Sequence, residues 1–439
     1  MQKLIKRYWA ILFLLIANLS IVHWLAIRYM DSSDESFGWL AILFIIVKLK
    51  ECKQQSCWRD GELILVAAIL SFNAFIFINV PILAKAILAC SGFSLLLSRL
   101  LFNRFFHLGT WGLCVLSLPI SATLQFFLGF PLRLLSSQLS GVFLRLSGFD
   151  VEVAGGVIKF GEKLISVDAP CSGVKMLTVT ALLVCLISVY KKLTNWQTTL
   201  LSLFALVILI FANSVRATWL FFTESGIALY DYKDVIHDTS GVIIFILIVS
   251  TLLLFHKFFL NKEHMKIEKE TVTSAKTFSI TIFIFSCLIT LFANPQKVEQ
   301  QDISMTVEFP ATWDGKKLQE LPMTAKELSF LKRFPGKIAK FRDKENNSYI
   351  FRIVTEKTRR LHSASDCFKG LGYRITYKPL VKDKFGVWQS LEAEKGGERK
   401  LVKEIIIDEA GRSWSDVSKW YWSASTSKYW NNVVIVSPL

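Results

Sequence analysis

The 439-residue sequence contains eight cysteines, and these lack the paired spacing that a zinc site requires. Cys52 and Cys57 form a C-x4-C pair, but no second pair accompanies it. No disulfide framework is evident, and the part predicted below to face outward has no C-x-x-C motif, which argues against a membrane thiol oxidoreductase. We therefore expect neither a metal site nor a cofactor.

The N-terminus also lacks the small-residue cleavage site of a secretory signal peptide. It has a basic start, with Lys3, Lys6 and Arg7, followed by an apolar run. Because further apolar runs follow, we interpret this segment as a membrane anchor that is kept in the protein.

Hydrophobic residues make up 52% of the chain and the mean hydropathy is +0.43, averages that soluble domains rarely reach. The excess lies in long apolar runs, as in proteins that cross a bilayer. A net charge of +16 would suggest nucleic-acid binding in a soluble protein, but here most basic residues flank the apolar runs. We therefore expect membrane lipids as partners, and no nucleic acid.

Nine apolar runs are candidates for spanning helices, which need about 20 residues each. The run at 37–49 is short for a span, and the polar tail after the last run is long enough, at about 145 residues, for a core of its own. Alternating segments at 348–354 and 401–407 predict strands in this tail. The sequence thus predicts a polytopic α-helical membrane protein of about nine spans (1–293) with a C-terminal soluble α+β domain (294–439). The nine runs are 8–28, 37–49, 62–80, 82–101, 108–129, 172–190, 197–215, 239–256 and 277–293.

Basic residues in the short loops predict the orientation, because loops rich in Lys and Arg stay in the cytoplasm. The first loop, 30–36, is acidic and is placed outside. With nine spans, residues 130–170 and the whole tail also lie outside, and every inside loop is basic. The inside loops contain Lys48, Lys50, Lys53, Arg59, Arg99, Arg104, Lys191, Lys192, Lys257, Lys262, Lys266 and Lys269.

Residues 130–170 are not expected to form a span. Apolar residues recur there at helical spacing between Arg133, Gln138 and Arg145, which predicts an amphipathic helix on the outer surface. Two short alternating runs, 151–154 and 157–160, then flank two glycines and predict a β-hairpin that leads into Cys171. The apolar residues of the helix are Leu132, Leu135, Leu139, Val142, Phe143 and Leu146.

Three polar residues stand out beside the apolar runs. The predicted spans place Cys171 at the outer start of one helix, Arg216 at the outer end of the next, and His237 at the outer start of the one after. Nothing about this coincidence was used to place the spans. The three segments are Asp168-Ala169-Pro170-Cys171-Ser172-Gly173, Asn213-Ser214-Val215-Arg216 and Ile236-His237-Asp238-Thr239-Ser240-Gly241.

These three side chains suit acyl transfer. A Cys171 thiolate would attack a carbonyl carbon and form a thioester, while His237 would protonate the leaving amine and then activate the incoming nucleophile. Arg216 would stabilise the oxyanion. A helix N-terminus lowers the pKa of a thiol, and Lys175 lies one turn later on the same helix face, so both would activate the cysteine. Asp238 would orient His237, although adjacent residues rarely face each other.

Each of these residues alone has an ordinary interpretation. An arginine at a helix end is often a snorkelling anchor, and a histidine at a span boundary is often a polar residue of the membrane interface. The hypothesis therefore depends on the coincidence of all three. Four other cysteines are interpreted as small apolar packing residues, namely Cys90, Cys114, Cys185 and Cys287.

At these motifs the sequence resembles the exosortase/archaeosortase family, whose members are polytopic membrane proteins with a Cys-Ser-Gly motif, a downstream Arg and a His that face outward. The specific match is Pro170-Cys171-Ser172-Gly173, Asn213-Ser214-Val215-Arg216, and His237 followed by Gly241, and the organisation matches over about residues 1–260.

The resemblance implies a cysteine peptidase/transpeptidase in a bacterial plasma (inner) membrane, with its active site on the extracytoplasmic side. Its substrates would be exported proteins with a C-terminal sorting signal of a short motif, a transmembrane helix and a basic tail. Cys171 would be the nucleophile, His237 the general acid/base and Arg216 the transition-state stabiliser. Asn213 would have a supporting role.

The tail is similar to the exosortase-associated, methanolan-biosynthesis-type domain found with some exosortases in exopolysaccharide loci. The similarity rests on His362 and on Cys367-Phe368-Lys369-Gly370-Leu371-Gly372-Tyr373, but the proline often found between this His and Cys is absent. Cys367 is the only cysteine of the tail, so we interpret it as a buried free thiol, with a redox or covalent role as the alternative.

A second class of function fits the same architecture, namely a non-catalytic membrane component or transporter in exopolysaccharide assembly. A transporter usually has polar residues near the middle of the membrane and broken helices. Here the notable polar residues cluster at the predicted outer boundary, which favours the enzyme. The acceptor nucleophile, whether water, an amine or a glycolipid, and the recognised motif do not follow from the sequence.

Overall fold

The computed structural model of the chain divides into two compact units. Unit 1 comprises residues 1–122, 175–212 and 238–298, and unit 2 comprises 123–174, 213–237 and 299–439. The predicted domain boundary at 293/294 stays a prediction. The residues that the structure describes are 2–30, 37–52, 58–75, 82–154, 156–161, 163–166, 173–227, 233–260, 275–292, 308–323, 334–358, 360–424 and 427–439.

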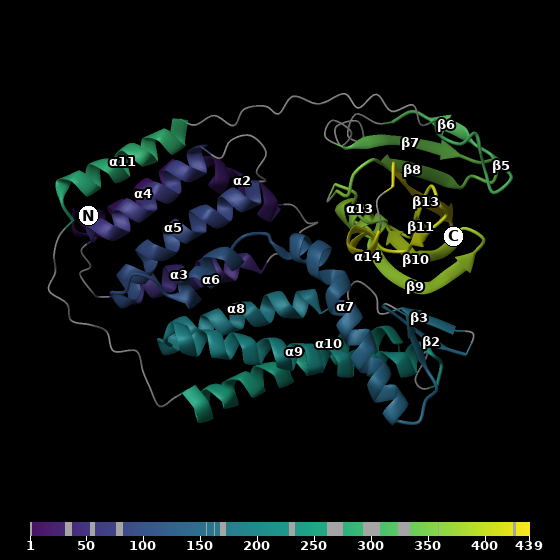
Figure 1. Cartoon of the computed structure of the whole chain (residues 1–439), viewed down its shortest axis with the longest axis horizontal. Coiled ribbons are helices and arrows are strands. Elements are labelled where there is room, and N and C mark those ends of the chain that lie inside the picture. Colours follow the sequence, from purple (N-terminus) through teal and green to yellow (C-terminus); the bar gives the residue numbers. More distant parts are fainter. Residues whose placement is uncertain are drawn as a thin grey trace. The chain divides into compact units, whose positions relative to one another are not determined.

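Helices account for all regular structure described before residue 150 (Figure 1). Four of them, α1, α4, α5 and α11, share one apolar core that contains Leu14, Leu63, Leu96 and Phe283. The helices are α1 (Gln2–Ala17), α2 (Leu19–Met30), α3 (Gly38–Glu51), α4 (Asp60–Phe75), α5 (Ile82–Phe102), α6 (Leu108–Leu116), α7 (Ser121–Leu146), α8 (Val174–Lys191), α9 (Asn195–Glu224), α10 (Lys233–Phe255), the π-helix His256–Leu260, and α11 (Thr277–Phe292).

Five described helices are long and apolar enough to cross a membrane, and a bent pair formed by α1 and α2 would be a sixth. The nine predicted spans are therefore not confirmed. The bent pair turns by 76° at its break, and α3, with 14 residues, would reach only about 21 Å, whereas a bilayer core is about 30 Å thick. The five are 82–102, 121–146, 174–191, 195–224 and 239–260.

The predicted span 108–129 is divided between two helices. α6 ends at Leu116 and α7 begins at Ser121, so the prediction was wrong here. Pro119 lies in the break, where its missing N–H and its ring are incompatible with a continuous helix. Residues 130–146 are helical as expected, but they continue a helix that already includes 121–129. The whole helix, 121–146, is long and apolar enough to cross a membrane, which differs from the surface helix that the sequence predicted.

The buried face of α7 is formed mostly by small and polar residues, and the sequence analysis did not assign it. Leu135, Val142 and Leu146 are exposed, whereas the buried residues are Gly129, Arg133, Ser136, Ser137, Ser140, Gly141 and Leu144. Periodicity identified the two faces correctly, but the small and polar face points into the protein. This arrangement is typical of helices that pack in lipid, where small residues permit close approach and polar groups pair between helices.

The predicted hairpin after α7 is confirmed and gains a third strand. β1 (Glu152–Ala154) pairs antiparallel with β2 (Val157–Phe160), and β2 pairs with β3 (Lys163–Ser166). Ile158 and Ile165 of this sheet share an apolar core with Ala217, Leu220 and Phe221 of α9. The small sheet is therefore fixed against α9 within unit 2.

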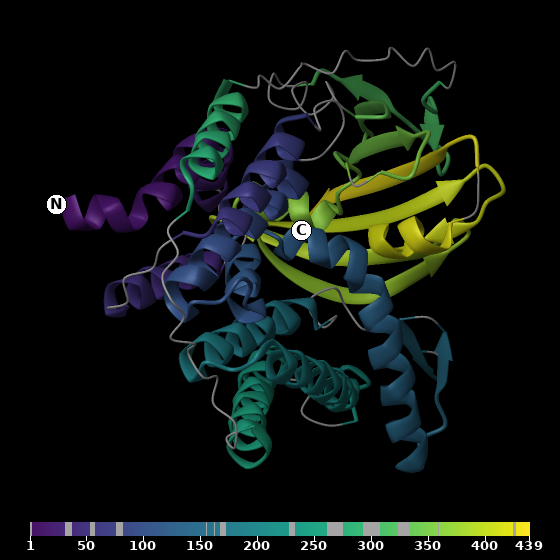
Figure 2. The ribbon, with the colours of Figure 1, turned by 60° about the vertical axis from the view of Figure 1, so that its left-hand side comes forward.

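The described part of the tail is rich in β-structure, with an antiparallel sheet in the order β6-β7-β8-β13-β11-β10-β9, and β12 pairs with β11. In Figure 2 its strands, green to yellow, lie side by side in one curved layer. The predicted strands at 348–354 and 401–407 are confirmed as β8 and β11. The elements are β4 (Thr312–Trp313), β5 (Lys316–Lys317), β6 (Gln319–Leu321), β7 (Gly336–Arg342), β8 (Ser348–Val354), α13 (Ala364–Gly370), β9 (Arg374–Asp383), β10 (Gly386–Lys395), β11 (Glu398–Asp408), β12 (Ser413–Trp414), α14 (Val417–Ser423) and β13 (Trp430–Pro438).

A buried polar network crosses three neighbouring strands of this sheet. Arg352 of β8 donates to Asn432 of β13 at 2.7 Å and to Glu404 of β11 at 2.8 Å. The other Glu404 oxygen accepts from the backbone N–H of Ala364, which begins α13. Burial raises the pKa of Glu404 while Arg352 opposes this shift. The carboxylate thus joins the sheet to the N-terminus of α13.

We predict that Glu404→Gln lowers the free energy of unfolding of the C-terminal part that contains β4 to β13, called the sheet domain below, by about 3 kcal/mol. The reason is that Arg352 would keep a buried charge without its counter-ion. Thermal unfolding of the full-length protein in detergent, followed by tryptophan fluorescence, measures the change. Glu345→Gln is the matched control, since Glu345 pairs with Lys316 on the surface and should contribute at most about 1 kcal/mol. Equal shifts for the two variants would contradict the importance of the network.

Candidate functional site

The segment 213–216 lies within α9, and its polar residues are buried. Asn213 is 2% exposed and Arg216 is 6% exposed. A snorkelling arginine extends its guanidinium into water, so the burial of Arg216 argues against that interpretation. A buried guanidinium is costly to hold without compensation, which makes this position a functional candidate.

Two serines of α7 hold this part of α9. The side-chain amide of Asn213 donates to Ser136 Oγ at 2.8 Å, and Thr218 Oγ1 donates to Ser140 Oγ at 3.0 Å. Ser136 and Ser140 are four residues apart on α7, and Asn213 and Thr218 are five residues apart on α9. Neighbouring turns of the two helices therefore contact each other. Sequence analysis missed these serines, although small residues at four-residue spacing in an apolar helix were a usable signal.

Gly173 brings the cysteine motif next to α9. A methyl group on Gly173 would lie 3.1 Å from the amide carbon and nitrogen of Asn213, so the glycine backbone contacts this side chain directly. Its φ of +80° also favours glycine. Cys171 itself, with residues 167–172, lies outside the described residues.

The strand before the cysteine motif is attached to the C-terminal end of α9. Lys163 of β3 donates to the carbonyl oxygen of Ser225, directly after α9, at 2.5 Å. A lysine at this place pairs favourably with the negative end of the helix dipole. The segment 167–172 is therefore flanked by two attachments to α9, one through Lys163 and one through Gly173.

The other predicted site residues are placed less completely. His237 and Asp238 lie in the second turn of α10, which begins at Lys233, just before the candidate span 239–260 that agrees with the predicted start of this span; their side chains are outside the described part. Lys175 lies in the first turn of α8, with its side chain exposed. The roles predicted for these three residues stay predictions.

Comparison with models of known protein families shows to which family the chain belongs. The family model described as Transmembrane exosortase (Exosortase_EpsH) matches residues 5–255, more than half of the chain. The chain belongs to the transmembrane exosortase family. No curated protein matches it, and no solved structure does. The match ends before the C-terminal sheet, so the kinship of that part of this exosortase stays a prediction.

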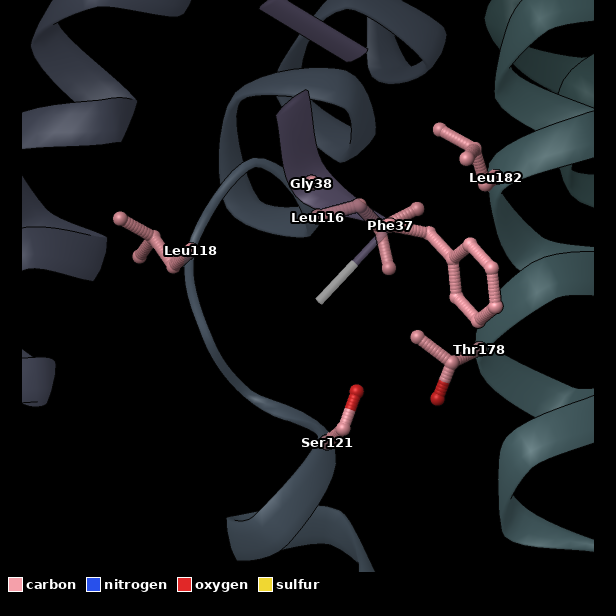
Figure 3. Close-up of a pocket in the computed structure, with 7 residues that line it drawn as sticks. All are labelled: Phe37, Gly38, Leu116, Leu118, Ser121, Thr178 and Leu182. Carbon is pink, nitrogen blue, oxygen red and sulfur yellow. The ribbon is translucent and has the colours of Figure 1, made fainter. Parts of the chain in front are cut away.

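A small, mostly apolar cavity lies in unit 1 of the exosortase. It is bounded by the start of α3, the break between α6 and α7, and the side of α8 (Figure 3). Figure 3 shows Thr178 and Ser121 with their hydroxyl groups at one side of it. The lining residues are Phe37, Gly38, Leu116, Leu118, Ser121, Thr178 and Leu182. Its size and apolar lining fit packing space between helices.

The packing interpretation of four cysteines agrees with their surroundings. Cys90, Cys114 and Cys287 are buried and Cys185 is partly buried. In the C-terminal sheet, Cys367 is exposed as a residue, so the prediction that it is buried was wrong; desolvation still raises the pKa of its thiol, while the nearby Arg352 lowers it. A raised thiol pKa disfavours the reactive thiolate.

We predict that Cys367 in the folded exosortase reacts with iodoacetamide near pH 7.5 more slowly than it does after unfolding in urea. The raised pKa leaves a smaller thiolate fraction in the folded protein, and the thiolate is the reacting species. Mass spectrometry of the peptide that contains Cys367 measures the rate. Modification as fast in the folded as in the unfolded protein would favour a reactive role for this cysteine.

Proposed function

We propose that this exosortase is a cysteine peptidase/transpeptidase that cleaves C-terminal sorting signals of exported proteins through a thioester intermediate. The observation that carries the proposal is the contact between Gly173 and Asn213, because it connects the Cys-Ser-Gly motif with the Asn-Ser-Val-Arg motif. This closeness supports a single site formed by two segments that are far apart in the sequence.

Chain length supports a short distance between the nucleophile and the arginine. Cys171 precedes Gly173 by two residues, which limits the distance between their Cα atoms to about 7 Å. Arg216 follows Asn213 by three residues, a rise of about 4.5 Å along α9. These lengths are compatible with one substrate carbonyl that both functional groups contact, which supports the proposal.

The proposed chemistry follows from these groups. The Cys171 thiolate attacks the scissile carbonyl, the C–N bond breaks, and His237 gives its proton to the leaving amine. The Arg216 guanidinium stabilises the oxyanion, and its burial strengthens this interaction because the local dielectric is low. His237 then removes a proton from water or an acceptor amine, which attacks the thioester and releases Cys171.

Substrates and location follow from the same proposal. The substrate carries a short motif, a transmembrane helix and a basic tail, and the membrane is a bacterial plasma membrane. The site and the C-terminal domain face the extracytoplasmic side, as the distribution of basic residues in the predicted loops favours. A connection with exopolysaccharide machinery would explain the similarity of the tail.

We predict that Cys171→Ala abolishes processing of a reporter that ends in a short motif such as Pro-Glu-Pro, as the family resemblance implies, an apolar helix and a basic tail. The reason is that the proposed thioester forms on the thiol that this substitution removes. Reporter cleavage by the full-length protein in proteoliposomes is the measurement, and trapping should give a thioester at Cys171. Cys185→Ala is the control, because Cys185 lies among packing residues of α8. Full processing by Cys171→Ala would refute the proposal and favour a non-catalytic role in polysaccharide export.

We predict that Gly173→Ala strongly lowers processing while the protein still inserts into the membrane. The added methyl group would press on the Asn213 amide and would also strain the backbone at φ +80°. Gly148→Ala is a matched control, since Gly148 has a φ of +88° but open space around it. An equal loss in both variants would mean that strain alone, and not the contact with Asn213, accounts for the effect.

A further inference from the structure

Helix α7 contains a proline, Pro131, in its interior. A proline has no N–H, so the carbonyl of Phe127, four residues earlier, receives no hydrogen bond along the helix. The indole N–H of Trp422, in α14 of the sheet domain, donates to this carbonyl oxygen at 2.8 Å. The sheet domain thus supplies the donor that the proline removes.

A second residue of α14 contacts the same turn. The hydroxyl of Ser418 accepts from the backbone N–H of Phe130 at 3.1 Å and donates to the carbonyl of Phe126 at 2.7 Å. These two backbone groups are the pair that an uninterrupted helix joins directly. A side chain placed between them is a known cause of a local helix distortion. Ser418 and Trp422 therefore satisfy three backbone groups in the turn before Pro131.

An ion pair and an aromatic contact strengthen the same interface. Arg133 of α7 forms an ion pair with Asp416 at 2.5 Å, and Asp416 also caps the N-terminus of α14 by accepting from the N–H of Lys419. The ring of Tyr421 lies 4.9 Å from that of Phe126. Arg133 is 5% exposed, so this ion pair is desolvated and its loss would be costly.

The next turns of α7 are hydrogen-bonded to α9, the helix that contains Arg216. Ser136, one turn after Arg133, accepts from Asn213, and Ser140 accepts from Thr218. Residues 126–133 of α7 therefore contact α14, and residues 136–140 contact α9. One helix joins the sheet domain to the segment that contains Arg216.

We propose that α14 of the sheet domain is a positioning element of the active site, which acts by fixing the Pro131 turn of α7 and thereby the place of Asn213 and Arg216. The inference rests on the proposed function, since it assigns the sheet domain a part in the chemical step. Ser418 and Trp422 are positioning residues, because they reach the site through α7.

The structure suggests why this contact is needed. Without α14, the carbonyl groups of Phe126 and Phe127 and the N–H of Phe130 would lose their protein partners, so the turn at Pro131 would rearrange to find water or other partners. Ser136 lies only five residues after the proline. A shift at the proline would therefore displace the serine that holds Asn213.

The first test measures reporter processing by full-length Trp422→Phe and Ser418→Ala in proteoliposomes. Trp422→Phe keeps the ring and removes the donor, and it should lower kcat by about tenfold, or about 1.4 kcal/mol, with KM unchanged. Trp313→Phe is the matched control, because this indole packs on Phe351 and Phe385 inside the sheet domain. An unchanged kcat, a change in KM alone, or an equal effect of Trp313→Phe would overturn the proposal.

A rescue variant separates positioning from misfolding. Pro131→Ala restores an N–H that can donate to the Phe127 carbonyl, so Trp422 becomes less necessary. We expect the double variant Pro131→Ala/Trp422→Phe to recover a large part of the kcat that Trp422→Phe loses. No recovery would show that Trp422 does not act through the proline turn and would reject the mechanism.

Hydrogen exchange gives a readout that does not depend on catalysis. In Ser418→Ala, amide exchange should increase both in 126–133 and in 213–218 if α7 transmits the position of α14. An increase confined to 126–133 would refute the coupling even if processing by the parent protein is normal. Cys171→Ala measured in parallel tests the reaction itself, so failure of the proposed function and failure of this inference are distinguishable.

Discussion

The pairing of polar groups on the buried face of α7 is the constraint on which unit 2 depends. Apolar surroundings give an unpaired backbone or side-chain group no water to bind, so each such group needs a protein partner. Pro131 creates this need within α7, and Ser136 and Ser140 extend it along the helix. The partners come from α14 on one side and from α9 on the other. Elements that are remote in the sequence are thereby fixed to one helix.

The same constraint explains what sequence analysis of α7 did not decide, namely which face of the helix packs against the protein. Periodicity separates a leucine-rich face from a serine and arginine face, but it does not tell which of them meets the protein. In water the leucines would turn inward. Beside lipid the preference reverses. Contact with lipid carries no penalty for the apolar face, and the polar face gains hydrogen-bonding partners inside the protein. Arg133 has its counter-ion, Asp416, nearly three hundred residues away, and no local pattern reports that contact.

Local chemistry made other features predictable. The hairpin at 151–160 follows from alternation around glycines, and β8 and β11 follow from alternation in 348–354 and 401–407. The motifs around Cys171 and Arg216 also indicated the family that the comparison identified. The sequence did not show which residues from distant segments contact each other. The contact of Gly173 with Asn213 depends on a positive φ and on absent side-chain volume, and neither has a periodic signature.

Burial of Arg216 connects these observations energetically. A guanidinium stabilises an oxyanion best where water is excluded, but exclusion of water also penalises the arginine itself. The site can bear that penalty only if the surrounding helices keep their places while substrate enters and leaves. The side chain of Asn213, one turn before Arg216, donates a hydrogen bond to Ser136 and lies next to Gly173. A rigid α7 therefore matters for a residue that is costly to bury, and the sheet domain supplies rigidity where Pro131 takes it away.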